Sequence, residues 1–278
     1  MRPHACSHAR GIKSGRFKET WMELCVLGSG SKGNCIYVAG RGAAVLVDQG
    51  FSHTELLKRL ESRELDISRV RAIVVSHEHH DHMNGVGITA RKLGVPVYAT
   101  RGTLAGRNGV FNGDEPRIFI EGGVTFRVGD LEFLPFTVSH DANEPVQFCI
   151  TSGRRKVSVA TDLGFVSTLV EQCLRGSDFV IIEANHDVEM LKRGSYPWEL
   201  KQRILGRTGH LSNRNAAELL FNLCCRDNPG AVLAHLSEEN NRADIAEREV
   251  RELFESFDRR IRSLRIALQH EASIVIGV

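Results

Sequence analysis

One short motif limits what this chain can be. The apolar run at 72–76 is continuous, as in a strand buried on both faces, and a polar His-Glu-His-His-Asp-His sequence follows it directly. Imidazole and carboxylate groups suit Zn²⁺ and neighbouring divalent metals. A loop at a strand end can send the first two ligands to one ion and the last two to another, about 3.5–4 Å away. The motif therefore favours a two-metal site with these ligands: His77, His79, Asp81 and His82.

The same pattern, an apolar strand followed by His or Asp, recurs later in the chain. Taken singly, each such residue is more often a surface residue than a ligand. Ligands at the ends of neighbouring strands converge on one rim of a sheet, where α/β active sites gather. Together with the first motif, the pattern predicts further metal ligands at His140, Asp162 and His235.

Apolar runs of strand length alternate with helical patterns in both halves of the chain, and residues 117–161 are expected to be all-β. This order predicts an α/β fold, with two sheets packed face to face and helices outside. Helices are expected at these ranges: 53–63, 82–93, 169–174, 187–205, 213–225 and 242–257.

The folded domain is expected to span residues 22–278, because the apolar pattern starts near Met22. Residues 1–21 are basic and polar and lack the apolar core of a secretory signal. They are predicted to be a disordered extension, with a basic contact arm as the alternative.

Composition excludes some classes of protein. No run of about 18 apolar residues occurs, so no membrane span is expected. The net charge of +2 does not by itself indicate a nucleic-acid-binding protein, so affinity for phosphate must come from local Arg and Lys. Seven cysteines without a C-x-x-C pair are typical of buried free thiols in a reducing cytoplasm.

The Gly-x-Gly-x-x-Gly sequence at 28–33 imitates a dinucleotide fingerprint. A dinucleotide site needs a helix after the third glycine, but residues 34–39 have a strand pattern. Neither a nicotinamide nor a flavin cofactor is therefore expected. The loop could hold a substrate phosphate through Ser31, Lys32 and Asn34, or it could be a tight turn with no ligand.

Four polar residues in the second half are further candidates. His210 precedes a helix, and we expect it to donate a proton to a phosphate oxygen or leaving group, the alternative being a helix-start polar residue. His186 and Ser212 are expected to contact substrate. A structural role for His186 is equally open, and Ser212 is also a plausible N-cap. Glu183 could orient a histidine.

The ordered ligands resemble those of the metallo-β-lactamase superfamily. Five segments, beginning at residues 28, 77, 183, 209 and 234, resemble its YycJ/WalJ (VicX) branch more narrowly. The resemblance implies a four-layer αββα sandwich. It also implies that His77, His79 and His140 hold one metal, that Asp81, His82 and His235 hold the other, and that Asp162 bridges them. The ions would be Zn²⁺ or Mn²⁺, with Fe²⁺ also open.

Members of this branch are described as cytoplasmic metal-dependent nucleases with 5′→3′ exonuclease activity on DNA. The resemblance therefore implies a phosphodiesterase, with DNA ahead of RNA as substrate and with Asp81 and His210 as catalytic residues. Asp162 stands where the resembled β-lactamases carry Cys, which argues against antibiotic hydrolysis. The alternatives are a hydrolase of a cyclic phosphate, phosphonate ester or thioester, and a metal-binding regulatory protein without catalysis. The sequence selects no oligomeric state.

Overall fold

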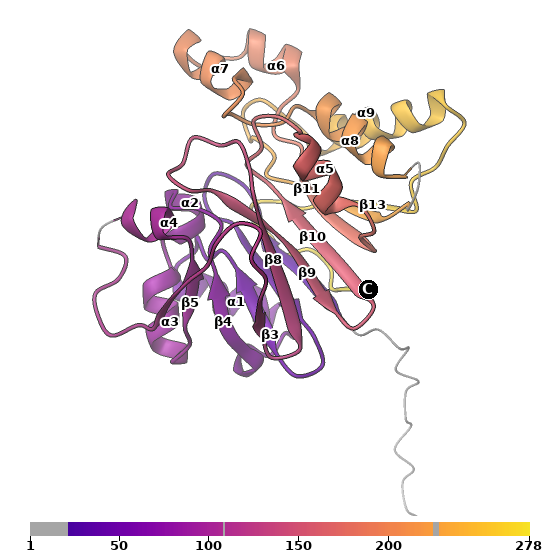
Figure 1. Ribbon diagram of the computed structural model, residues 1–278. Helices are drawn as coiled ribbons and strands as arrows, with labels where there is room; N and C mark the ends of the chain where they lie inside the picture. The colour runs from indigo at the N-terminus through magenta and orange to yellow at the C-terminus, as the bar shows by residue number, and fades with distance from the viewer. Residues whose placement is uncertain (1–21, 108, 225–227) are drawn as a thin grey trace, which may run out of the picture.

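The computed structural model describes residues 22–107, 109–224 and 228–278. The extension expected at 1–21, with its alternative as a contact arm, lies outside the described residues. Two sheets of seven strands each make the centre of the fold (Figure 1).

The first sheet contains both termini of the described domain. Its strands, in spatial order, are β14 (Ile276–Gly277), β1 (Glu23–Gly28), β2 (Cys35–Ala39), β3 (Ala44–Val47), β4 (Val70–Val74), β5 (Val97–Ala99) and β6 (Arg117–Phe119). Its helices are α1 (His53–Glu61), α2 (His80–Met83), α3 (Val86–Leu93) and α4 (Arg101–Ala105), with a short 3₁₀ turn at Ile67–Arg69.

The second sheet is built from the middle and the end of the chain. Its strands, in spatial order, are β13 (Ser263–Ile266), β12 (Gly230–Ala234), β11 (Phe179–Glu183), β10 (Arg155–Ala160), β9 (Val146–Ser152), β8 (Leu131–Thr137) and β7 (Phe126–Val128). Its helices are α5 (Thr168–Leu174), α6 (Val188–Arg193), α7 (Trp198–Leu205), α8 (Asn213–Cys224) and α9 (Ala243–Ser256).

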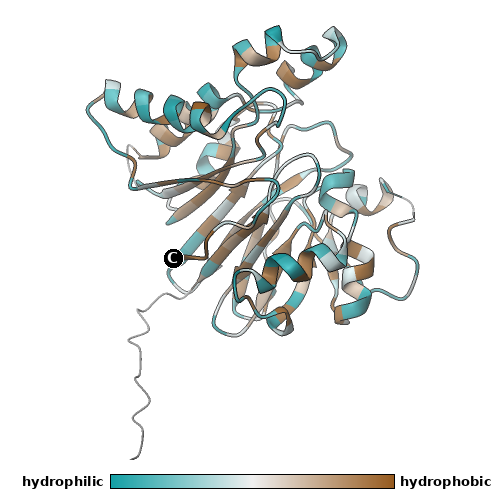
Figure 2. Cartoon of the chain, turned by 180° about the vertical axis from the view of Figure 1, so that it is seen from behind, coloured by the Kyte–Doolittle hydropathy of each residue, from teal (hydrophilic) through white to brown (hydrophobic). Residues whose placement is uncertain are grey.

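Three hydrophobic cores separate four layers. Alternate residues of β3 show why: Val45 and Val47 belong to the core between the sheets, whereas Leu46 belongs to the core under α1 and α3. A third core joins the second sheet to α5, α8 and α9. Figure 2 shows hydrophobic residues concentrated in the strands and hydrophilic residues on the outer helices. The predicted αββα sandwich is confirmed.

Two helix predictions were wrong in their extent. The range 187–205 was expected to be one helix, but α6 ends at Arg193 and α7 begins at Trp198. Gly194 and Pro197 lie between them, and both residue types interrupt helices. Likewise, the helix expected at 82–93 is divided into α2 and α3 at Gly85.

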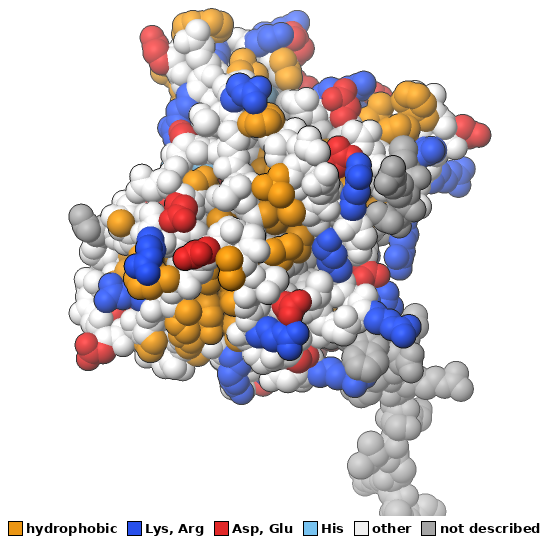
Figure 3. All heavy atoms as spheres, viewed as in Figure 1, with side chains coloured by type: hydrophobic (Ala, Val, Ile, Leu, Met, Phe, Trp, Pro, Cys, Tyr) orange, Lys and Arg blue, Asp and Glu red, His pale blue; other side chains and the backbone are white. Residues whose placement is uncertain are grey.

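The described part of the chain has no helix that is long and apolar enough to span a bilayer. On the face seen in Figure 3, basic and acidic side chains are interspersed around hydrophobic ones. This mixture agrees with the nearly balanced net charge of +2. Any attraction for phosphate must therefore come from local basic groups.

Strand ends turn sharply towards one place. Residues Asp48, Asp162 and His235 follow β3, β10 and β12 within two positions, and their φ angles are 59°, 56° and 56°. This left-handed conformation is uncommon for residues with a side chain and concentrates at functional sites. Each turn ends a strand and aims a His or Asp at the seam between the two sheets.

Candidate metal centre

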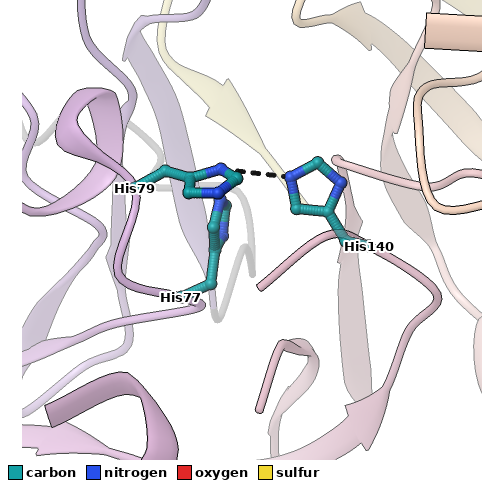
Figure 4. Close-up of side chains that lie close together, drawn as sticks. All are labelled: His77, His79 and His140. Carbon is teal, nitrogen blue, oxygen red and sulfur yellow. Dashed lines mark hydrogen bonds between the residues drawn. The ribbon is translucent and has the colours of Figure 1, made fainter. Parts of the chain in front are cut away.

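Three histidines from two parts of the fold meet at the seam (Figure 4). His77 and His79 lie between β4 and α2, and His140 follows β8. One ring nitrogen from each lies within 4.8 Å of the others. The shortest approach, 3.2 Å, joins His79 Nδ1 and His140 Nε2.

Hydrogen bonds fix which nitrogen of each ring is free. Carbonyl oxygens accept from the opposite nitrogens of His79 and His140, at 3.2 Å from Asp141 O and from Gly209 O respectively. With those nitrogens as donors, the two nitrogens that face each other are left as acceptors, and a cation between them would relieve that opposition. His77 Nδ1 lies 2.9 Å from Ser76 Oγ.

The remaining nitrogen of His77, Nε2, is buried and has no hydrogen-bond partner among the described residues. An orphaned buried acceptor costs free energy, which a bound cation would offset. Burial, followed by the neighbouring His82 ring, holds the pKa of His77 well below its ordinary value. The ring is therefore neutral, which is the form that binds metals.

A second group of ligand atoms lies beside the first and surrounds Asp81 Oδ2. His82 Nε2 lies 3.4 Å from this oxygen, and His235 Nε2 lies 3.5 Å from it. The opposite ring nitrogens donate to carboxylates, at 2.9 Å to Asp48 and at 2.8 Å to Glu183. Partners of this kind orient metal-binding histidines and raise their basicity.

Asp162 lies between the two groups. Its Oδ2 is 3.4 Å from His82 Nε2, and its Oδ1 is 3.9 Å from His140 Nε2. Burial alone would raise the pKa of this carboxyl, but the surrounding histidines, His235 first, hold it well below its ordinary value. A buried carboxylate with no hydrogen bond to Oδ2 in the described chain is a suitable bridging ligand. This donor set of nitrogens and oxygens suits divalent ions such as Zn²⁺.

Glu183 links the metal ligands to His210. Its Oε1 accepts from Nδ1 of both His210 and His235, each at 2.8 Å. Its Oε2 accepts from the backbone N–H groups of Leu163 and Leu211 at 2.9 Å. Burial raises the pKa of Glu183, but His210 and then His235 lower it to about 2. The carboxylate is therefore ionised and fixed on four sides.

His210 presents its other nitrogen to solvent-accessible space. Burial lowers the pKa of this ring, yet the Glu183 carboxylate outweighs it, and the pKa lies above its ordinary value. The side chain is 22% exposed and lines a cleft of about 490 Å³. A ring with this placement can donate a proton into the cleft.

The cleft brings some predicted residues together and leaves others apart. The predicted metal ligands Asp81, Asp162 and His235 line it together with His210, Ser31 and Lys32, and residues of α7 form part of the opposite wall. Three predicted substrate contacts lie outside the described cleft wall: Asn34, His186 and Ser212.

The contacts of those three residues explain their positions. Asn34 is buried, and its Nδ2 donates to Asp81 Oδ2 at 3.0 Å. Ser212 accepts from the N–H of Asn215 at 3.2 Å, which is the contact of a helix cap. His186 is buried, and burial lowers its pKa to about 4.

Sequence reasoning missed Asp48, which holds His82 and also accepts from Ser76 N and Ser76 Oγ at 2.8 and 2.9 Å. A signal was present, because Asp48 directly follows the apolar strand β3, as the other site residues follow theirs. Asp141, which touches His79 and pairs with Arg203 at 2.5 Å, was also missed. Its neighbour His140 is the only cue.

Comparisons with known proteins agree with this geometry. Residues 43–235 match the model of the beta-lactamase superfamily domain. The chain is 39% identical over 238 residues to exodeoxyribonuclease YycJ of Bacillus anthracis, covering 84% of this chain and 89% of that protein. It is 38% identical over 236 residues to exodeoxyribonuclease WalJ of Streptococcus pneumoniae, covering 82% and 86%.

Two solved structures share the fold. The metallo-beta-lactamase fold protein YhfI of Bacillus subtilis superposes with a TM-score of 0.67 at 16% identity, covering 91% of this chain and 98% of that one. Zn²⁺-bound PqqB of Methylobacterium extorquens superposes with a TM-score of 0.66 at 17% identity, covering 92% and 100%.

Proposed function

Because the chain belongs to the metallo-β-lactamase superfamily and to its YycJ/WalJ branch, we propose that it is a metal-dependent phosphodiesterase that degrades DNA from a 5′ end. The observation that carries the proposal is the set of buried nitrogens and carboxylate oxygens that converge with their other atoms already hydrogen-bonded. The names of the relatives favour a nuclease over a small-ester hydrolase or a regulatory protein without catalysis.

The proposed ligand sets follow the two groups of atoms. One divalent ion would be held by His77, His79 and His140, and the other by Asp81, His82 and His235, with Asp162 available to both. Zn²⁺ and Mn²⁺ suit these donors, and so does Fe²⁺. When bound, such a pair supplies an acidified water as nucleophile and offsets charge on the phosphoryl oxygens.

The remaining steps belong to side chains of the cleft. Asp81 orients the attacking water. His210 donates its Nε2 proton to the leaving oxygen, and the ionised Glu183 stabilises the charged ring before the transfer. Ser31 and Lys32, at the rim, contact the DNA phosphate, whereas Asn34 holds Asp81 in place.

The protein is proposed to act in the cytoplasm on DNA ahead of RNA. Four described cysteines support the location, because they are free thiols, as a reducing compartment maintains them: Cys25, Cys35, Cys149 and Cys173.

Hydrolysis of 5′-labelled DNA with added Mn²⁺ or Zn²⁺ tests the proposal, with RNA of the same sequence in parallel. His79→Ala and Asp81→Ala should abolish cleavage. His80→Ala is the matched control, because this exposed histidine of the same motif belongs to neither group of ligand atoms. Cleavage by His79→Ala and Asp81→Ala at the parent rate would overturn the proposal.

A further inference from the structure

The α7 side of the metal cleft presents apolar side chains that belong to no core. Tyr196, just before α7, and Leu200 and Ile204, within it, line the cleft. Each is half-buried, and none belongs to the three hydrophobic cores of the described residues. A spacing of four residues places Leu200 and Ile204 on one face of the helix. Figure 1 shows α6 and α7 at the top of the molecule, beyond the ends of the strands. These three side chains are called the α7 wall below.

Backbone contacts hold the α7 wall beside the proposed catalytic groups. The N–H of His210 donates to the carbonyl oxygen of Ile204 at 3.0 Å. A Cβ added to Gly209 would lie 2.2 Å from the same oxygen, so the two backbones are in close contact. The N–H of Asp141, the residue after a proposed metal ligand, donates to the carbonyl oxygen of Thr208 at 3.1 Å. The wall therefore has a fixed position relative to the proton donor and to the first group of ligand atoms.

The chemistry of the α7 wall suits a flat, uncharged group. The bases of single-stranded DNA pack on aromatic side chains, whichever base is present, because every base has a π-face. Two carboxylates, Glu238 and Glu239, also line the cleft, and they do not repel a neutral base as they would a second phosphate. The cleft volume of about 490 Å³ lies within the range of pockets that enclose small ligands. The wall therefore fits the base of a nucleotide whose phosphate lies at the metal centre.

We propose that the α7 wall binds the base of the 5′-terminal nucleotide, with the ring of Tyr196 as its stacking partner. Water adds its oxygen to phosphorus, the P–O3′ bond breaks with its electron pair on O3′, and O3′ takes the proton of His210. The proton that the water releases, and the one that His210 regains, exchange with solvent. O3′ belongs to the terminal nucleotide, so this nucleotide lies on the His210 side of the cleft, next to the wall. The inference rests on the proposed function and deepens it, because it identifies the part of the substrate that the cleft recognises.

Removing the ring and removing the base should have the same effect. The substrates are 3′-labelled single strands of about ten nucleotides: one intact, one with an abasic residue at the 5′ terminus, and one with it at the second position. With the parent protein and Mn²⁺, kcat/KM for release of the first nucleotide should be roughly tenfold lower for the terminal abasic strand, as expected when one stacked base is lost.

Tyr196→Ala should lower kcat/KM by the same factor for the intact strand and for the strand that is abasic at the second position. It should cause no further loss on the terminal abasic strand. Tyr196→Phe keeps the ring and should match the parent on all three. Trp198→Ala is the matched control, because it removes an aromatic side chain that is 63% exposed, belongs to the same helix and lies outside the cleft lining.

Two results would overturn the inference. One is an equal loss in Tyr196→Ala on the intact and the terminal abasic strands, because the ring would then act on something other than the base. The other is a parent protein that cleaves the intact and the terminal abasic strands equally well, and this comparison needs no variant to fold. If the parent protein with metal cleaves none of the strands, the proposed function is wrong instead.

Discussion

At the scale of single residues, the site depends on the atoms that do not face the centre. A histidine ring offers one nitrogen to a metal only when the other is held, and here Asp48 and Glu183 hold His82 and His235. These carboxylates are buried and are fixed in turn by backbone N–H groups. Removing either carboxylate should therefore weaken metal binding through the histidine that it holds, although neither carboxylate is itself a proposed ligand.

Asp48→Asn should weaken metal binding by about 10–100-fold, because the amide cannot hold His82 as a carboxylate does. Competition with a chromophoric chelator measures this affinity. Asp130→Asn is the control, since Asp130 also accepts hydrogen bonds from backbone N–H groups, those of Arg41 and Gly42, but far from the centre. Equal affinities in Asp48→Asn and the parent would show that this contact is not needed.

His210→Ala should lower kcat on labelled DNA by about 10²–10⁴-fold, as removal of a general acid does, while bound metal stays at the parent level. Glu183→Gln should lower both quantities, because Glu183 also holds His235. Rates and metal content measured on the same samples separate the two effects. Metal loss in His210→Ala equal to that in Glu183→Gln would instead make His210 a ligand.

At the scale of elements, the sequence predicted those ligands that directly follow a strand. His140, Asp162 and His235 each follow an apolar run, and that pattern is local. Asp48 follows an apolar strand in the same way but was not predicted as a site residue. The rejection of a dinucleotide site was sound, because β2 is the strand that the sequence predicted after the three glycines. Contacts such as Arg203 with Asp141 join positions 62 apart, and no local pattern encodes them.

Helix α2, which carries Asp81, is packed tightly against Gly50, shortly after the end of β3. A Cβ added to Gly50 would lie 1.8 Å from Asp81 O, a backbone atom that cannot move aside alone. Gly50→Ala should therefore displace α2, destabilise the protein by about 1–3 kcal/mol and reduce bound metal. Gly113→Ala is the control, because its nearest neighbour would be 3.5 Å away. Parent-like unfolding midpoint and metal content in Gly50→Ala would contradict this packing.

At the scale of the whole molecule, the proposed ligands come from both sheets. His77, Asp81 and their neighbours follow β4 of the first sheet, whereas His140, Asp162 and His235 follow strands of the second. A bound ion would therefore cross-link the two halves of the sandwich at one end of the core between them. The two-sheet architecture was predictable from the alternation of elements, but the pairing of strands across the seam was not.

Metal should stabilise the fold as a whole, because a ligand that binds only the folded state raises the free energy of unfolding. A thermal unfolding midpoint measured after chelation should be lower than after Zn²⁺ or Mn²⁺ is restored. His79→Ala should show a smaller increase on metal addition, and His80→Ala the same increase as the parent. Unfolding midpoints that do not change with metal in any variant would contradict the expectation that bound metal stabilises the fold.

The most direct measurement is the number of divalent ions held by the freshly purified protein, by elemental analysis followed by titration of the chelated form. The account predicts two ions per chain, one for each of the two groups of ligand atoms. A chain that carries no divalent ion and takes none up in titration would contradict the central claim that these strand ends form a dinuclear metal centre.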